Sequence, residues 1–511
     1  MSKGDLHPAL VGLEPRSVWE RFDEIRRIPR GSQNEEGMRA YLEGLAAEQS
    51  WKCVRDAAGN IVIYVPGTGA GKRAPALAIQ GHMDMVCVKR RDVAHDFAAD
   101  PIELKRAELE FGGEPRRDCL QARDTSLGSD NGVGIAAGLA IALDPELDHP
   151  PLELIFTADE EVGMSGAEGL DVGLISARRM LNLDAEEHGS IYLSCAGGRD
   201  LVASWNIERE DIAGDDLPVW VTISGLAGGH SGVEIHLGRQ NAISLLVQAL
   251  TNGAVELDGV RLGKLDGGAA SNAIPRSAEA LLWCARHRAE PLVESLIAVV
   301  QQAMESFLPE DREGIHFEAR IGEPDEMDAF DPNSVGPLSA AATRMILKAL
   351  ATIPDGVIAM SEALEGLVET SSNLGVVETR DTELCAKALT RSSKNGGVLS
   401  VQDRIERRLE ASGAMIEFEN EWPGWEADLT NGLVGRSIAV FEKLFESSPA
   451  IKAIHGGLEC GFFAQRIPGM SMISFGPEIR NAHTPDEAIV LDTVPPFFEL
   501  VRALVRDLCR A

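Results

Sequence analysis

The stretch Ala76-Leu-Ala-Ile-Gln-Gly-His-Met-Asp84 decides the fold. Its first half is a short apolar run of the kind that forms a buried strand, and His82 and Asp84 follow directly. Similar apolar runs at residues 152–157 and 179–183 are also followed by acids. Segments whose apolar residues have the spacing of a helix lie between such runs along the chain. Strands that alternate with helices indicate an α/β sheet, in which functional residues gather at the carboxyl ends of strands.

The same patterns predict elements along the rest of the chain. We expect helices at residues 15–27, 34–47, 132–143, 241–251, 291–307, 338–351, 401–411, 432–445 and 492–509, and strands at 60–66, 219–223, 279–285, 315–319, 383–389, 415–418 and 471–475. The helix at 132–143 is rich in Gly and Ala, which predicts that it packs closely on its neighbour.

The middle of the chain contains a repeated pattern. Ser271-Asn272 precedes one predicted strand and Ser372-Asn373 precedes another, each within a helix, strand, helix, strand unit. The repeat predicts an inserted domain of two similar halves, with chance recurrence of a common α/β pattern as the alternative. The expected organisation is an α/β domain at residues 1–196 and 427–511, interrupted by an α+β domain at 197–426 with halves at roughly 197–322 and 323–426.

Composition excludes several classes of protein. The chain has 511 residues, with 44% hydrophobic and 25% charged residues, as expected for globular domains and not for a disordered chain. Its 80 acids against 48 bases give a net charge of −32, which argues against nucleic acid as a partner. We expect no membrane segment, because no apolar run approaches about 18 residues, and no export signal at the N-terminus.

The cysteines indicate the compartment and restrict the kind of metal site. All eight are scattered, without a Cys-x-x-Cys pair, which favours reduced thiols in a cytoplasm. Any metal site is therefore expected to use His, Asp and Glu.

Five separated segments supply such residues at predicted strand ends or at a helix start. Each has an ordinary alternative, such as a surface His-x-Asp, a helix N-cap or a solvated acidic turn. Together they suit two divalent ions that share one carboxylate, and the lack of thiolate favours zinc, with cobalt or manganese possible. Adjacent acids suit divided roles, one as ligand and one as proton carrier. The residues are His82 with Asp84, Asp130, Glu160 with Glu161, Asp184, and His483.

These segments resemble the metal motifs of a known family. Gly81-His-Met-Asp84, Ser129-Asp-Asn-Gly132, Asp159-Glu-Glu-Val-Gly163, Asn182-Leu-Asp184 and His483-Thr-Pro-Asp-Glu487 look like those of the dizinc amidohydrolases, which include aminoacylases, carboxypeptidases, tripeptidases and carnosinases. Gly228-Gly-His-Ser-Gly232 and His455-Gly-Gly-Leu-Glu-Cys-Gly461 resemble its bacterial aminoacyl-histidine dipeptidase branch. The similarity covers nearly the whole chain. It implies a discontinuous catalytic domain with a mixed sheet, and an inserted lid.

The resemblance implies a role for each matching residue in the catalytic domain. His82 and His483 would be terminal ligands, and Asp130 would bridge two metal ions, with zinc as the expected metal. Glu161 and Asp184 would each ligate one metal. Glu160 would be the general base, and Asp84 would support His82.

The resemblance also implies substrate-binding residues in the lid. His230 would help to hold the substrate carbonyl, and its neighbouring glycines permit a tight turn. A surface histidine is the ordinary alternative. Asn272, Arg391 and His455 are further candidates for contacts with the substrate.

The implied function is that of a cytosolic dipeptidase that cleaves Xaa-His dipeptides with a metal-activated water. One alternative is an N-acyl-amino-acid amidohydrolase, because the metal motifs are shared. Another is a catalytically silent scaffold, although every ligand type and the Glu160 base are present. The expected partner is a short peptide, and the chain would be a monomer or a homodimer.

The duplicated lid leads to a prediction about assembly. In relatives with a single-copy lid, the resemblance implies that a partner subunit lends its lid histidine. Here we expect the second lid copy to imitate the partner, so that one chain completes its own site. Activity should therefore persist when dilution separates any dimer, as followed by light scattering. Loss of activity in step with dissociation would contradict this hypothesis.

Overall fold

The computed structural model describes residues 6–113, 115–254, 259–322, 335–362, 364 and 366–510. The chain forms two compact units. Unit 1 consists of Met1–Ser194, Ala427–Ala453 and Glu459–Ala511, and unit 2 consists of Cys195–Glu426 and Ile454–Leu458. The short segment 454–458 thus belongs to unit 2, although the sequence placed it in the first domain.

Unit 1 is built on an eight-stranded sheet with the order β1-β2-β6-β3-β7-β21-β8-β20. Strands β6, β3, β7 and β21 run parallel, so their carboxyl ends lie at one edge of the sheet. The bounds are β1 (Lys52–Arg55), β2 (Ile61–Val65), β3 (Leu77–His82), β6 (Leu152–Thr157), β7 (Arg179–Asn182), β8 (Ser190–Cys195), β20 (Ala450–Ile454) and β21 (Ser471–Ser474).

The core of unit 1 lies between this sheet and its helices. Apolar side chains of β3, β6 and β7 form one buried cluster with those of five helices. These are α1 (Arg16–Ile25), α2 (Glu36–Glu48), α3 (Ser129–Ala142), α11 (Gly432–Phe445) and α13 (Val494–Asp507). The predicted close packing of α3 is confirmed, because a Cβ added at Gly134 would lie 2.5 Å from the Leu183 carbonyl oxygen.

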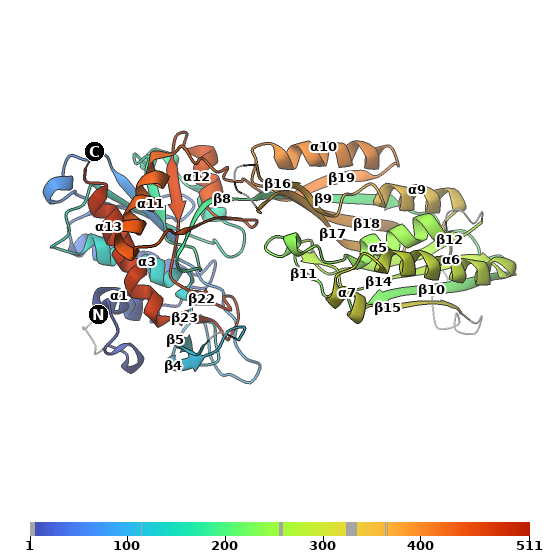
Figure 1. Cartoon of the computed structure of the whole chain (residues 1–511), viewed down its shortest axis with the longest axis horizontal. Helices are drawn as coiled ribbons and strands as arrows, with labels where there is room; N and C mark the ends of the chain where they lie inside the picture. Colours follow the sequence, from blue (N-terminus) through green and yellow to red (C-terminus); the bar gives the residue numbers. More distant parts are fainter. Residues whose placement is uncertain are drawn as a thin grey trace. The chain divides into compact units, whose positions relative to one another are not determined.

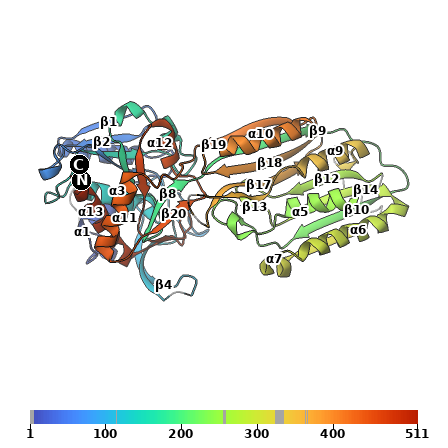
Figure 2. The same cartoon turned by 45° about the horizontal axis from the view of Figure 1, so that its top comes forward.

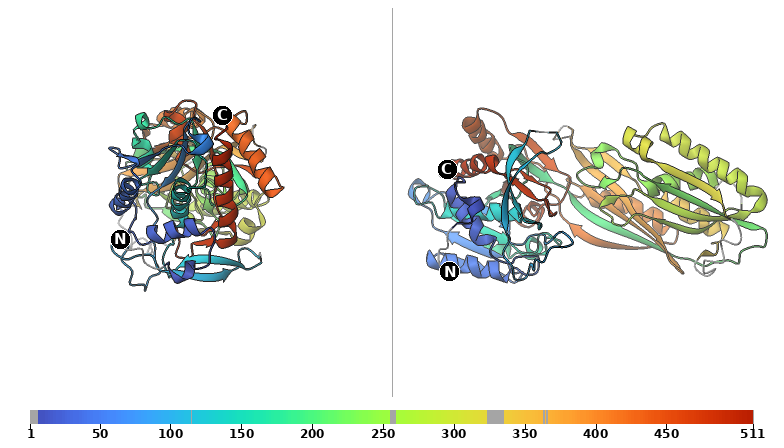
Figure 3. Two further views of the ribbon diagram at one scale, coloured as in Figure 1. Left: turned by 90° about the vertical axis from the view of Figure 1, so that its left-hand side faces the viewer. Right: turned by 90° about the horizontal axis from the view of Figure 1, so that it is seen from below.

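A four-stranded sheet, which the sequence reading did not predict, also belongs to unit 1 (Figures 1 and 3). Its order is β22-β23-β5-β4, with β4 (Leu104–Leu109), β5 (Arg117–Ala122), β22 (Ile479–Arg480) and β23 (Ala488–Val490). Strands β22 and β23 are antiparallel, and the loop that joins them carries His483. This sheet therefore fixes both ends of a candidate ligand loop.

Unit 2 contains a nine-stranded sheet. Eight strands follow the order β15-β10-β14-β12-β17-β18-β9-β19, and β16 pairs with β17. Helices α5, α6, α9 and α10 lie along the sheet and share a buried apolar cluster with it (Figure 2). The strands are β9 (Gly197–Asn206), β10 (Asp216–Ser224), β12 (Arg261–Gly267), β14 (Ala278–Ala285), β15 (His316–Ile321), β16 (Gly356–Met360), β17 (Val368–Thr379), β18 (Glu383–Ser392) and β19 (Met415–Trp422), and the helices are α5 (Ala242–Ala249), α6 (Arg286–Met304), α9 (Ala340–Leu350) and α10 (Gly397–Glu410).

The strand order of unit 2 reads alike from its two edges. From one edge the order is β15-β10-β14-β12, and from the other it is β19-β9-β18-β17. Strand β9 pairs with β18 and β19, so it lies with the predicted second half although it precedes β10 in the chain. The boundary predicted at 322/323 adjoins residues 323–334, which lie outside the described residues.

The two copies of the Ser-Asn motif meet in unit 2. The Asn373 side-chain Nδ2 donates hydrogen bonds to the carbonyl oxygens of Ser271 and Ala273, both at 2.8 Å. Asn272 itself is exposed, and its carbonyl oxygen accepts from the Ser231 amide at 2.8 Å. The two asparagines therefore have different surroundings. Across the described parts of both units, no helix has the length and apolar character needed to span a membrane.

Candidate functional site

Two groups of side chains in unit 1 share the carboxylate of Asp130. His82 Nε2 lies 2.9 Å from Asp130 Oδ1 and 3.2 Å from Asp184 Oδ1. His483 Nε2 lies 3.2 Å from the other oxygen of Asp130, Oδ2, and 3.0 Å from Glu161 Oε2. Each group offers ligand atoms within 4.8 Å of one another and could hold a metal ion.

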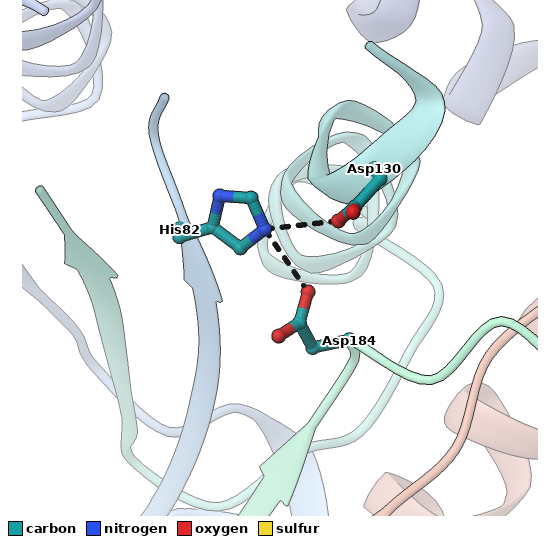
Figure 4. Close-up of side chains that lie close together, drawn as sticks. All are labelled: His82, Asp130 and Asp184. Carbon is teal, nitrogen blue, oxygen red and sulfur yellow. Dashed lines mark hydrogen bonds and ion pairs between the residues drawn. The ribbon is translucent and has the colours of Figure 1, made fainter. Parts of the chain in front are cut away.

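The fold delivers these side chains from separate elements (Figure 4). His82 closes strand β3, Asp130 lies in the first turn of α3, and Asp184 follows strand β7. The N-cap of α3 is Gly128, and the two oxygens of the Asp130 carboxylate pair with His82 and His483, so the N-cap interpretation of Asp130 is wrong. Its carboxylate faces the two imidazoles instead.

Asp84 supports more of the site than the sequence suggested. Its Oδ1 lies 3.3 Å from His82 Nδ1, as expected for an acid that orients this imidazole. It also accepts hydrogen bonds from the backbone amides of Glu160, at 3.0 Å, and Glu161, at 3.2 Å. Ser32 Oγ donates to its other oxygen at 2.8 Å. One buried carboxylate thus fixes both the histidine and the turn that carries the two glutamates.

The electrostatics of the site reflect crowded acids. Burial alone would lower the pKa of His82, but the carboxylates of Asp184 and Asp130 raise it well above its ordinary value. Hydrogen bonds to Asp130 and Glu161 raise the pKa of His483 to about 11. Burial raises the pKa of Asp184 to about 6, and it raises that of Glu160 well above the ordinary value. The site therefore favours positive charge.

The chemistry of the donor set fits divalent metal ions. The acids Asp130, Glu160, Glu161 and Asp184 outnumber the two imidazoles, and buried charges need countercharge. Glu161 Oε1 is buried, and it accepts no hydrogen bond from any residue that the structure describes. Such an oxygen is available as a ligand, and imidazole with carboxylate suits zinc, cobalt or manganese.

Two buried residues that the sequence did not single out as site residues hold the start of α3 in place. Glu487 accepts hydrogen bonds from the amides of Leu127, Gly128 and Ser129 at 2.7 to 2.9 Å. The buried guanidinium of Arg30 donates to the carbonyl oxygens of Met83, Asp84 and Gly128. Glu487 was visible in the His-Thr-Pro-Asp-Glu motif, whereas Arg30 had no sequence signal.

A pocket adjoins this site within unit 1. Its volume is about 460 Å³, and its wall includes Glu161 together with the apolar residues Met85, Val86, Phe97 and Val162. This size is within the range of small-molecule pockets, and the lining suits an apolar side chain.

The other four predicted site residues lie in unit 2. His230 Nδ1 accepts hydrogen bonds from the amides of Gly232, at 3.1 Å, and Val233, at 3.2 Å. Burial and the charge of Arg391 lower the pKa of His230, which favours the neutral ring. Because Nδ1 accepts, the proton of the neutral ring is on Nε2, which can donate to a carbonyl oxygen.

Arg391 is a buried cation without a carboxylate partner among the described residues. It is 5% exposed, and its guanidinium lies 5.2 Å from the centre of the Trp422 ring. His455 Nε2 lies 2.7 Å from Ser371 Oγ, and burial together with Arg391 lowers the pKa of His455 to about 3. A buried guanidinium beside neutral groups is suited to bind an anion. Unit 2 thus brings His230 and His455 within electrostatic range of Arg391, whereas Asn272 is exposed on a turn.

The side chains that could hold metal ions thus lie at the carboxyl edge of the parallel strands of an α/β sheet. The chain belongs to the peptidase family M20/M25/M40, whose model matches residues 78–507. The resemblance seen in the sequence and the predicted fold class are therefore confirmed.

Individual relatives match over almost the whole chain. The cytosol non-specific dipeptidase of Escherichia coli (strain K12) is 36% identical over 499 residues, which cover 98% of this chain and 99% of the relative. The crystal structure of aminoacylhistidine dipeptidase from Vibrio alginolyticus superimposes with a TM-score of 0.88, at 35% identity and 98% coverage of each chain. The aminopeptidase PepT from Bacillus cereus ATCC 10987, at 14% identity and a TM-score of 0.54, shares the fold, with 98% of this chain and 100% of that one covered.

The contacts of Glu487 lead to a stability prediction. Glu487→Ala would leave three buried amides without an acceptor, so the free energy of unfolding should fall by at least about 2 kcal/mol in urea titrations. Asp486→Ala is the matched control, because Asp486 is exposed and its contact is a surface pair with Arg90. That change should shift the free energy by less than about 1 kcal/mol. Equal effects of the two changes would contradict the role given to Glu487.

Proposed function

We propose that this chain is a cytosolic metallo-dipeptidase that hydrolyses Xaa-His and other small unblocked dipeptides. The observation that carries the proposal is the sharing of Asp130, whose two oxygens face two different imidazoles. This geometry suits a pair of divalent ions bridged by one carboxylate. The names of the two relatives at about 35% identity support dipeptides as the substrate class.

The proposal assigns ligands to two metal ions. His82, Asp130 and Asp184 would hold one ion, and His483, Asp130 and Glu161 the other, with zinc favoured and cobalt or manganese possible. Bound there, the ions would supply Lewis acidity to the substrate carbonyl and lower the pKa of a water molecule. Asp84 would act through His82 and the glutamate turn as a positioning residue.

Glu160 is the proposed general base. Its carboxyl lies close to His82 and Glu161, and no ligand role is required of it in either group that shares Asp130. It would take a proton from the attacking water and pass it to the leaving amine nitrogen as the carbon–nitrogen bond breaks. Its raised pKa, caused by burial, suits a group that both accepts and returns a proton.

Unit 2 would supply the contacts that select the substrate. We assign the Nε2–H of His230 to the substrate carbonyl oxygen and the guanidinium of Arg391 to the terminal carboxylate. Asn272 and His455 are proposed as further substrate contacts. One apolar side chain of the dipeptide would occupy the pocket beside Glu161.

The different roles proposed for Glu160 and Asp130 lead to a prediction. Glu160→Ala should reduce turnover by about 10² to 10⁴-fold while metal content stays nearly intact, because a general base is lost but no ligand. Asp130→Ala should lose metal, because both ion sites share this carboxylate. Metal analysis of the purified variants, with steady-state kinetics, checks both outcomes. Equal loss of metal in the two variants would contradict the assignment.

A substrate panel tests the proposed function. The enzyme, loaded in turn with zinc, manganese or cobalt, should release histidine from alanyl-histidine or carnosine faster than it deacylates N-acetyl amino acids. The reverse order would favour the amidohydrolase. Fewer than one ion per chain after gentle purification, with no activity restored by any of the three metals, would favour a silent scaffold.

A further inference from the structure

Four buried polar side chains of unit 1 form a hydrogen-bonded network. Gln80 on β3, Thr157 on β6, Asn182 on β7 and Glu459 at the start of α12 (Cys460–Arg466) are each at most 1% exposed. Gln80 Nε2 donates to Thr157 Oγ1 at 3.2 Å and to Glu459 Oε2 at 2.6 Å. Thr157 Oγ1 donates to Glu459 Oε2 at 2.6 Å, and Asn182 Nδ2 donates to Gln80 Oε1 at 2.5 Å.

The network lies next to the candidate ligands along three neighbouring strands. Gln80 precedes His82 by two positions on β3, so both side chains point to the same face of the sheet. Asn182 is the last residue of β7 and precedes Asp184 by two positions, and Thr157 ends the strand that leads to Glu160. The strands are in parallel register, with Gln80 opposite Asn182 and His82 opposite Thr157. The network therefore joins the strand ends that present the ligands.

Glu459 is the unusual member of this network. Its Oε2 accepts hydrogen bonds from two neutral side chains, and its Oε1 is buried without a hydrogen-bond partner among the described residues. It also forms no ion pair with any described lysine or arginine. Burial raises the pKa of Glu459 to about 8. A buried carboxyl without a cation destabilises a fold, so its presence directly beside the ligand strands calls for a functional reason.

We propose that Glu459 is a positioning residue for the metal site. Through Gln80 and Thr157 it holds the ends of β3 and β6, and thereby fixes His82 and the turn of Glu160 and Glu161 in the geometry that binds metal. The inference rests on the proposed function only in that unit 1 binds divalent ions. Residues that support metal ligands without binding the metal themselves typically change metal affinity by 10- to 100-fold when they are removed.

The test measures metal affinity directly. Purified full-length protein is stripped of metal, and Co²⁺ or Zn²⁺ affinity is determined by competition with a chelator, under conditions in which circular dichroism shows each variant to be folded. Glu459→Ala should weaken binding about 10- to 100-fold. Glu459→Gln should stay within about threefold of the unchanged protein, because its amide oxygen still accepts from Gln80 and Thr157.

A matched control is available on the same sheet. Glu153 is a buried carboxylate of β6, but it accepts from the amides of Ser176 and Ala177 near the opposite end of the strand. Glu153→Ala should lower stability and leave metal affinity unchanged. Loss of affinity in Glu153→Ala equal to that in Glu459→Ala would overturn the proposal, since general destabilisation would then explain both.

A second variant covers the case in which Glu459→Ala does not fold. Thr157→Val keeps the side-chain shape and removes one of the two donors to Glu459, so it should weaken metal binding in the same direction. Unchanged affinity in Thr157→Val, or in folded Glu459→Ala, would overturn the role of Glu459 while the proposed function stands. If the protein without any substitution binds neither Co²⁺ nor Zn²⁺, that result would instead contradict the proposed function itself.

Discussion

The concentration of negative charge at one edge of the parallel strands is the constraint on which the rest of unit 1 depends. Asp130 lies between two imidazoles, and Glu161 and Asp184 complete the two groups. Buried carboxylates that converge on the same two imidazoles repel one another unless cations lie among them. Surrounding hydrogen bonds hold the acids in place, from Arg30 and Glu487 at the start of α3 to Asp84 behind His82. Much of the buried polar structure therefore serves to keep like charges together.

Unit 2 buries a positive charge, whereas unit 1 concentrates negative charge. Arg391 is buried against an aromatic ring, and its charge lowers the pKa values of His230 and His455. The neutral histidines can donate or accept without adding repulsion, while the guanidinium stays available for an anion. The proposed function assigns these side chains to the carbonyl oxygen and the terminal carboxylate of a dipeptide substrate.

Much of the fold was predictable because local pattern decides it. The apolar runs before His82, Glu160 and Asp184 are strands β3, β6 and β7, and the Gly/Ala-rich segment is the closely packed helix α3. The strands of the four-stranded sheet were missed because they are short or alternate with exposed polar residues, as in β4 and β22. Strand β9 was missed for another reason. It pairs with β18 and β19, which lie far along the chain, and the residues around β9 carry no signal of this long-range pairing.

The sequence by itself determined which residue types stand at the strand ends, because a period of two and the ends of apolar runs are local properties. It also carried the motifs that identify the family. Only the tertiary structure decided that Asp130 divides its two oxygens between His82 and His483, and that it is not a helix cap. It likewise decided that Glu459 reaches Gln80 across 379 positions and Glu487 reaches Leu127 across 360. Hydrogen bonds between such distant segments depend on how strands are ordered in the sheet, which neither residue's neighbours in sequence can specify.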